Sequence, residues 1–97
     1  MIPTKNKLYS ALENVSSPLK NLMVTVTYDE SHFPQNCSAD LESSKYGGRI
    51  THWPEHLFEF QFHDLHSGDV VFLDTIEFKD QECLSLFIME LFTKKLK

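Results

Sequence analysis

Two runs of alternating apolar and polar residues, joined by a short polar turn, constrain the fold of this chain more than any other feature. In residues 57–63, Phe58, Phe60 and Phe62 alternate with polar side chains. Residues 70–78 continue the pattern, with four predicted inward positions at Val70, Phe72, Ile76 and Phe78. Successive side chains of a strand point to opposite faces of a sheet, so the pattern predicts a β-hairpin with a Phe-lined inner face.

Apolar residues at helical spacing indicate a helix on each side of the strands. Residues 4–15 form the first predicted helix, with Thr4 as a candidate N-cap, and Pro18 marks its end because the residue before a proline disfavours helical geometry. Residues 81–95 form the second predicted helix, which begins after Asp80 as its N-cap.

The rest of the chain completes an α+β fold. Residues 21–28 and 49–53 are predicted strands, and the polar residues 29–47 between them are predicted to form a long loop. The element order is α-β-β-β-β-α. It predicts a four-stranded antiparallel sheet with two helices packed on one face. Residues 1–97 are expected to form a single binding domain, because this length holds one core.

Two features of the hairpin leave alternatives open. Leu57, Val71 and Leu73 fall on the outer face, where apolar residues are unusual unless the face is covered. Either a helix or the long loop covers them, or they bind a partner. Asp74 interrupts the inner pattern, and a β-bulge that re-aims it is favoured over a buried functional carboxylate.

The distribution of charge limits the classes of partner. The net charge is −5, but residues 21–92 carry thirteen acidic residues against Lys45, Arg49 and Lys79, a balance of −10. An acidic body repels a phosphate backbone, so direct nucleic-acid binding is disfavoured. The acidity serves either solubility alone or recognition of a basic protein.

No pattern in the sequence indicates catalysis, a metal site or a cofactor. Cys37 and Cys83 are expected to be free thiols, and neither has a local base in a recognisable catalytic spacing. None of the five histidines matches a metal-ligand spacing; they are His32, His52, His56, His63 and His66. Without an apparent signal peptide or apolar span, we expect a soluble cytoplasmic protein that is not an enzyme and does not enter a membrane.

One stretch resembles a known family. The run Arg49-Ile50-Thr51-His52-Trp53, then Glu55, an alternating strand ending near Asp64, and Ser67-Gly68-Asp69-Val70 are similar to the TriTu family of immunity proteins. The resemblance covers roughly Lys45 to Asp80, about a third of the chain, and the final helix is compatible with it. Pro54 and His56 depart from the small turn, often with glycine, that is expected after the tryptophan.

The resemblance implies a non-enzymatic antitoxin of a bacterial contact-dependent growth inhibition or related polymorphic toxin system. Such a protein binds the C-terminal toxin domain of its cognate effector and blocks its active site. For this family the implied toxin is a tRNA-cleaving nuclease that acts with elongation factor Tu, which would be a third member of the complex. A homodimer through the outer sheet face is also left open.

The candidate toxin-binding residues are chosen by their charge and expected exposure. No family motif assigns this role to them. They are Asp29, Glu30, Asp40, Glu42, Tyr46, Trp53, Glu55 and Glu59. A basic nuclease site would attract acidic side chains, and exposed aromatic rings are good anchors for a protein partner. The alternative function is a small acidic secretion-chaperone-like or regulatory adaptor that binds another protein.

Overall fold

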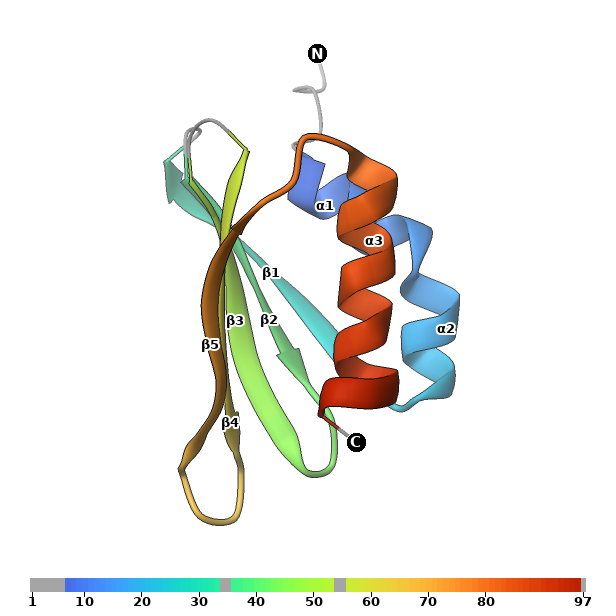
Figure 1. The fold of residues 1–97 in the computed structure, drawn as a ribbon, viewed down its shortest axis with the longest axis vertical. Coiled ribbons are helices and arrows are strands. Elements are labelled where there is room, and N and C mark those ends of the chain that lie inside the picture. Colours follow the sequence, from blue (N-terminus) through green and yellow to red (C-terminus); the bar gives the residue numbers. More distant parts are fainter. Residues whose placement is uncertain (1–6, 34–35, 54–55, 97) are drawn as a thin grey trace.

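The computed structural model places a five-stranded antiparallel sheet against a layer of helices (Figure 1). It describes residues 7–33, 36–53 and 56–96, and between residues 29 and 37 the backbone alone. The sheet order is β1-β2-β3-β4-β5, so every strand pairs with its neighbour in the sequence. The elements are α1 (Lys7–Asn14), α2 (Ser16–Asn21), β1 (Thr25–Phe33), β2 (Asn36–Glu42), β3 (Tyr46–Trp53), β4 (Leu57–Asp64), β5 (Val70–Glu77), α3 (Gln81–Glu90) and the π-helical turn η1 (Leu91–Lys95).

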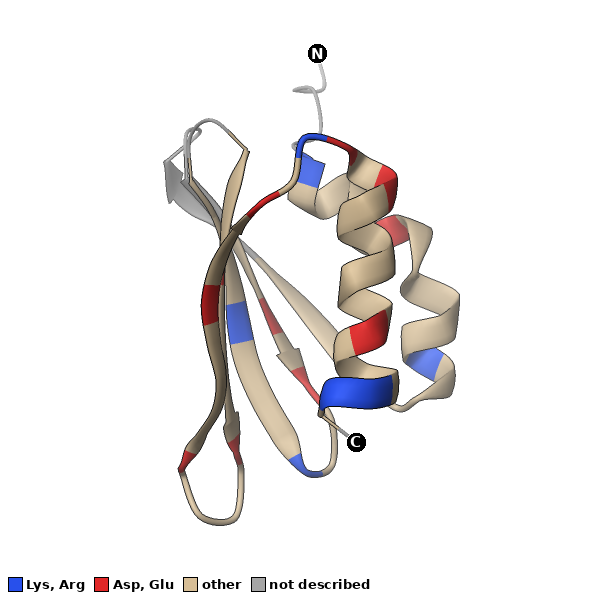
Figure 2. Cartoon of the chain, viewed as in Figure 1, with Lys and Arg blue, Asp and Glu red and all other residues tan. Residues whose placement is uncertain are grey.

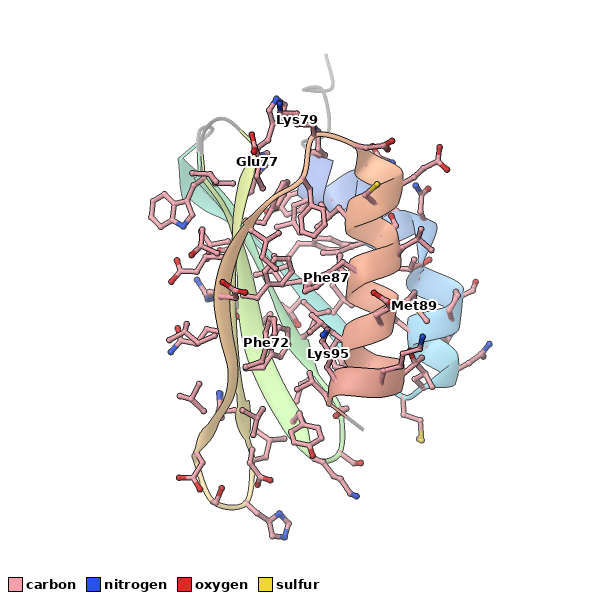
Figure 3. All side chains as sticks on the ribbon, viewed as in Figure 1. Phe72, Glu77, Lys79, Phe87, Met89 and Lys95 are labelled. Carbon is pink, nitrogen blue, oxygen red and sulfur yellow. The ribbon has the colours of Figure 1, made fainter. Side chains whose placement is uncertain are left out.

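The helices cover one face of the sheet, as predicted, and the core lies between the two layers. Phe58, Phe60 and Phe62 of β4 are fully buried, which confirms the predicted inner face. Residues from all three α-helices are fully buried in the same core: Leu8, Ala11, Leu12, Leu19, Leu84 and Ile88. Across the interface, Phe72 of β5 and Phe87 of α3 point toward each other, with ring centroids 6.0 Å apart (Figure 3).

The prediction of four strands is wrong, because most of the predicted loop, residues 29–33, 36–42 and 46–47, is in strands. They contain the end of β1, all of β2 and the start of β3. In β2, Ala39 and Leu41 are fully buried on the inner face. This strand has none of the β-branched or aromatic residues that favour strands, so its pairing with β1 and β3 decides its conformation. A tight turn joins β2 to β3, where the N–H of Ser43 donates to the carbonyl of Tyr46 at 2.8 Å.

The predicted N-terminal helix is corrected at its end. α1 ends at Asn14, but a second helix, α2, begins at Ser16, where the sequence predicts a stop. Pro18 lies in the first turn of α2, where a backbone N–H has no acceptor within the helix, so its missing N–H removes no hydrogen bond. Three helices therefore pack on the sheet instead of two, and β1 begins later than predicted, at Thr25. The candidate N-cap Thr4 lies outside the described residues.

Met23 ends α2 in the left-handed conformation, with φ of 61°. Its N–H donates to the carbonyl of Lys20 at 2.9 Å, and the N–H of Val24 donates to the carbonyl of Leu19 at 2.9 Å. These are the two hydrogen bonds of a Schellman motif. Glycine is usual at this position because a Cβ is strained there. The side chain of Met23 is 81% exposed, so little packing offsets the strain.

Replacing Met23 with glycine is therefore expected to stabilise the fold. Relief of the left-handed strain should exceed the extra entropy that glycine gives the unfolded chain, and the net gain should be about 0.5–1 kcal/mol. Met23→Val is the opposed control, since a β-branched residue tolerates this conformation least. Urea unfolding of the three proteins measures the order. A Met23→Gly variant less stable than the Met23→Val variant would contradict the expectation.

Strand β5 follows the predicted alternation except at its start. Three of the predicted inward residues are packed against the core: Phe72, Ile76 and Phe78. Val70 is instead 54% exposed. A β-bulge between Phe62 and His63 of β4 shifts the register, so that His63 pairs with Val70 and Val71 becomes the extra residue. The shift turns Val70 to the face opposite the helices.

Asp74 is neither at a bulge nor buried, so both alternatives from the sequence are wrong. It pairs in register with Phe60, and its side chain is exposed. β5 is an edge strand of the sheet, and an inward carboxylate at an edge stays open to water. Its Oδ1 accepts a hydrogen bond from the N–H of Thr75 at 2.8 Å.

The C-terminal helix begins where predicted. Asp80 is its N-cap, and its Oδ1 accepts a hydrogen bond from the N–H of Glu82 at 2.8 Å. The predicted helix over 81–95 changes to a π-helical turn from Leu91. Ser85 Oγ donates to the carbonyl of Ala11 at 3.1 Å in the core, which ties α3 to α1.

Candidate protein-binding face

The face of the sheet away from the helices is uncovered in the described part of the chain (Figure 1). We call it the open face. Strand register assigns to it Thr25, Thr27, Ser38, Asp40, Glu42, Gly47, Arg49, Thr51, Trp53, Leu57, Glu59, Gln61, His63, Val70, Leu73, Thr75 and Glu77. The sequence left open whether a helix or the expected loop covers this face. The helices lie on the other side and the expected loop is part of the sheet, so that alternative is wrong.

Apolar side chains are exposed along the β4–β5 side of the sheet. On the open face, Leu57 is 40% exposed, Val70 54% and Leu73 60%. Val71, the extra residue of the bulge, is also exposed, at 43%. Trp53 is the cross-strand neighbour of Leu57 and extends the group onto β3. A set of exposed apolar side chains rimmed by polar residues is typical of a surface that binds a protein. The other alternative from the sequence, that these residues bind a partner, is therefore our hypothesis for this face.

Two candidate residues, Trp53 and Glu59, are brought together by adjacent strands. The indole Nε1 of Trp53 donates a hydrogen bond to Glu59 Oε1 at 3.0 Å. The bond fixes the orientation of an aromatic ring that is 38% exposed. An oriented ring with a carboxylate beside it can contact apolar surface and a cationic side chain of the same partner.

Asp40, a third candidate, is paired within the chain. Arg49 Nε donates to Asp40 Oδ1 at 2.9 Å and Nη2 donates to Oδ2 at 3.2 Å, while Nη1 donates to Ser38 Oγ at 3.2 Å. About half of each charged side chain is exposed, so the pair stabilises the fold by at most about 1 kcal/mol. Among the described residues, Arg49 is the only Lys or Arg of the open face, and Asp40 offsets its charge.

The remaining candidate residues do not form one cluster. Glu42 is exposed at the end of β2 on the open face. Tyr46 lies on the inner face and packs partly buried against the core, on the other side of the sheet. Asp29 and Glu30 belong to β1, where the backbone alone is described, and Glu55 lies outside the described residues.

Hydrogen bonds shape the turn between β4 and β5. Asp64 Oδ1 accepts from the N–H of His66 at 2.7 Å and of Ser67 at 3.0 Å. The backbone N–H groups of Ser67 and His66 hold the pKa of Asp64 below its usual value, because they stabilise the carboxylate. Gly68 adopts a φ of +80°, as its place in the turn predicts. The hairpin therefore ends in a defined acidic tip.

Two histidines lie at the other end of the sheet, beside α1. His52 stacks on Phe58 with ring centroids 4.3 Å apart, and Lys7 Nζ lies 2.8 Å from His56 Nδ1. Burial lowers the pKa of His52, and the charges of Lys7 and His56 lower it further. Among the residues that the structure describes, no three His, Cys, Asp or Glu side chains are grouped to hold a metal ion. Cys83 is an exposed free thiol of α3.

The lowered pKa of His52 makes stability depend on pH. The folded pKa lies below the ordinary value of 6.5, so the unfolded chain binds more protons as the pH falls through this range. The contribution is complete above the unfolded pKa and is lost as the pH falls toward the folded pKa. Free energies of unfolding of wild type and His52→Phe, measured between about pH 8 and 5, should show a shallower decline for the variant. Phenylalanine keeps a ring beside Phe58 without titrating, and equal declines would refute the role of His52.

Sequence reasoning missed two features of this face. The partner of Arg49 depends on the pairing of β2 with β3, which the loop prediction concealed. The exposure of Val70 depends on the bulge, and nothing in the local alternation signals an extra residue. The alternation did place Leu57 and Leu73 on the outer face.

Within the described residues, no helix combines the length and the apolar character needed to cross a membrane. A protein-family model described as "Immunity protein TriTu" matches residues 6–94. Among curated proteins, none matches the chain. The family model covers nearly all of the chain, whereas the motifs that carry the resemblance in the sequence cover about a third.

Proposed function

The chain belongs to the TriTu family of immunity proteins, and from this premise we propose which toxin it neutralises and which surface it uses. Family membership implies a cognate toxin and a non-enzymatic role. We propose that the toxin domain is a tRNA-cleaving nuclease acting with elongation factor Tu in a contact-dependent growth inhibition system. The chain neutralises it in the cytoplasm by covering its active site with the open face.

The charge of the open face is the observation that carries this proposal. Exposed apolar side chains lie next to Glu59 and Glu77, Glu42 adds charge elsewhere on the face, and the single arginine of the described open face is paired with an aspartate. Figure 2 shows few basic positions on the described strands. A nuclease must attract a phosphate backbone, so its active site is basic. An acidic face with apolar side chains along one side complements such a site and accelerates association with it.

Individual residues have different roles in the proposed contact. Trp53 is the aromatic anchor, and Glu59 orients it and offers its second oxygen to a cationic side chain. Glu42 contributes charge at the rim. Asp40 contributes less, because Arg49 already occupies its carboxylate. Asp29, Glu30 and Glu55 remain candidates through their sequence alone.

Matched charge reversals on the two faces of the molecule test the surface. The partner is the C-terminal domain of the cognate toxin, with its binding followed by stopped-flow and titration calorimetry. Glu42→Lys with Glu77→Lys changes the open face, and Glu13→Lys with Glu90→Lys makes the same charge change on the helices. Only the open-face pair should slow association, by about tenfold or more at low salt, and reduce its salt dependence.

The outcomes separate the parts of the proposal. Co-expression of wild type should rescue cells from this toxin and leave non-cognate toxins active. Equal effects of the two double variants would exclude the open face as the contact surface. Absence of binding to the toxin domain would refute its assignment as the target. Recovery of elongation factor Tu with the toxin complex, but not with the chain alone, would support the factor as a third member.

The exposed apolar residues also favour a second candidate, a secretion-chaperone-like adaptor or a homodimer that uses the same face. Leu57, Val71 and Leu73 would then bind an extended effector segment or a second copy. An effector gene with a secretion signal next to this one would favour the adaptor. Sedimentation equilibrium would detect the homodimer, and Leu73→Glu should dissociate it.

A further inference from the structure

The outer edge of β5 offers backbone groups that the sheet does not use. The N–H of Phe78 donates to the carbonyl of His56 at 2.9 Å, so the backbone of residue 78 faces β4. In an antiparallel strand both polar groups of a residue point to the same side, and successive residues alternate. The groups of Ile76, Asp74 and Phe72 therefore also face β4. Those of Leu73, Thr75 and Glu77 face the open edge.

One of these edge N–H groups, that of Thr75, already donates to an acceptor within the chain. The carboxylate of Asp74 lies 2.8 Å from the N–H of Thr75, where the carbonyl of an added strand would dock. This bond agrees with the outward direction of the Thr75 backbone. Asp74 is exposed and has no cationic partner among the ion pairs of the described residues. It therefore brings negative charge to the middle of the edge.

The whole hairpin around this edge is acidic and partly apolar. Residues 57–77 contain five acidic residues and no Lys or Arg: Glu59, Asp64, Asp69, Asp74 and Glu77. Figure 2 shows acidic positions along β5 and beside its turn with β4. Leu73, in the middle of the strand, is 60% exposed. A strand docked here would meet free main-chain groups, an apolar side chain and negative charge together.

We propose that the edge of β5 binds an extended, basic segment of the toxin domain as a sixth strand of the sheet. Main-chain hydrogen bonds to Leu73, Thr75 and Glu77 supply the docking, as in other cases of strand addition. A Lys or Arg of the incoming segment takes the carboxylate of Asp74 and releases the N–H of Thr75. This inference rests on the proposed function and specifies the edge, beyond the open face, as the recognition element.

Charge explains why the edge selects a basic strand over a second copy of this chain. Two β5 edges side by side would oppose hairpins with five acidic residues each, and like charges across a strand pair are unfavourable. Inward charges and bulges are known protections of sheet edges, and β5 has both in Asp74 and Val71. The same groups that prevent self-association attract a cationic strand.

Proline at residue 75 tests the edge while sparing the sheet. The N–H of Thr75 points away from β4, so Thr75→Pro removes an outward donor and leaves the pairing of β5 with β4 intact. Thr75→Val is the matched control that keeps the donor. Calorimetry with the cognate toxin domain should show binding at least about tenfold weaker for Thr75→Pro than for Thr75→Val.

Amide hydrogen exchange of the wild type gives a second readout that needs no variant. Addition of the toxin domain should slow exchange at Leu73 and Glu77. The amides of Asp74 and Ile76 face β4 and are internal references that should change little. This measurement decides the matter if the proline variant does not fold, which circular dichroism would reveal.

The results distinguish this inference from the proposed function. Tight binding by Thr75→Pro together with unprotected edge amides would overturn the docked strand and leave toxin binding intact. A wild-type chain that does not bind the toxin domain would overturn both. Protection of the edge amides that grows with the concentration of this chain alone would identify a second copy as the occupant and also overturn the proposal.

Discussion

Replacement of Phe60 with alanine should lower the free energy of unfolding by about 3–5 kcal/mol, among the largest effects of any single substitution in this chain. Phe60 is fully buried at the centre of β4. Its ring lies 5.0 Å from that of Phe87 and 6.4 Å from that of Phe72, measured between centroids. Truncation removes these contacts and leaves a cavity between the sheet and α3, which the surrounding rings cannot fill without leaving their own contacts.

A matched truncation on the surface isolates the effect of burial. Leu86 of α3 is 66% exposed, so Leu86→Ala should change stability by less than about 0.5 kcal/mol. Urea unfolding followed by circular dichroism measures both variants. Domains are stable by only about 5–15 kcal/mol, so the Phe60→Ala variant should be near the limit of folding at 37 °C. A loss below about 1 kcal/mol would mean that the aromatic core repacks around the gap.

The second large effect is expected from Gly48→Ala, although it adds only one methyl group. A Cβ at residue 48 would lie 2.2 Å from the carbonyl oxygen of Gln61 and 2.4 Å from the ring of Phe62. The first contact is with the backbone of β4, which cannot move without breaking strand pairing. We therefore expect a loss of about 3 kcal/mol, at the upper end of the range for overpacked cores.

The adjacent glycine provides the control for this substitution. A Cβ at Gly47 would meet the end of the Leu65 side chain at 3.0 Å, on the opposite face of the sheet. Leu65 is 40% exposed and can turn away. Gly47→Ala also restricts the unfolded chain, so its net effect should stay within about 1 kcal/mol of zero. If the two alanine variants were equally stable, the close packing of Phe62 on Gly48 would be refuted.

The sequence was sufficient to predict the elements whose patterns are strong. The alternation around Phe60 correctly gave the hairpin, its inner face and the layer that covers it. Asp80 correctly gave the start of α3. The motif from Arg49 to Trp53 indicated the immunity family that the family model then showed over most of the chain.

The parts that could not be predicted depend on pairing between strands. In β2, Cys37, Ala39 and Leu41 alternate with polar residues, but only Leu41 is a large apolar residue, so the pattern is too weak to mark a strand. The strand that the sequence did not predict, β2, forms because β1 and β3 pair with it on its two sides. The contact of Trp53 with Glu59 has the same origin, because cross-strand partners depend on a register that the sequence does not display.

The strand order described above also bears on how the chain folds during synthesis. Every strand pairs with the one made just before it, so the sheet forms through contacts close in sequence, which favours fast folding. The hydrogen bond from Ser85 to Ala11 instead joins residues 74 positions apart. The phenylalanines of β4 can be buried against α3 only after that helix has been made. Formation of the sheet and completion of the core are therefore separate steps, and the core that supports the open face is complete only when α3 has packed on it.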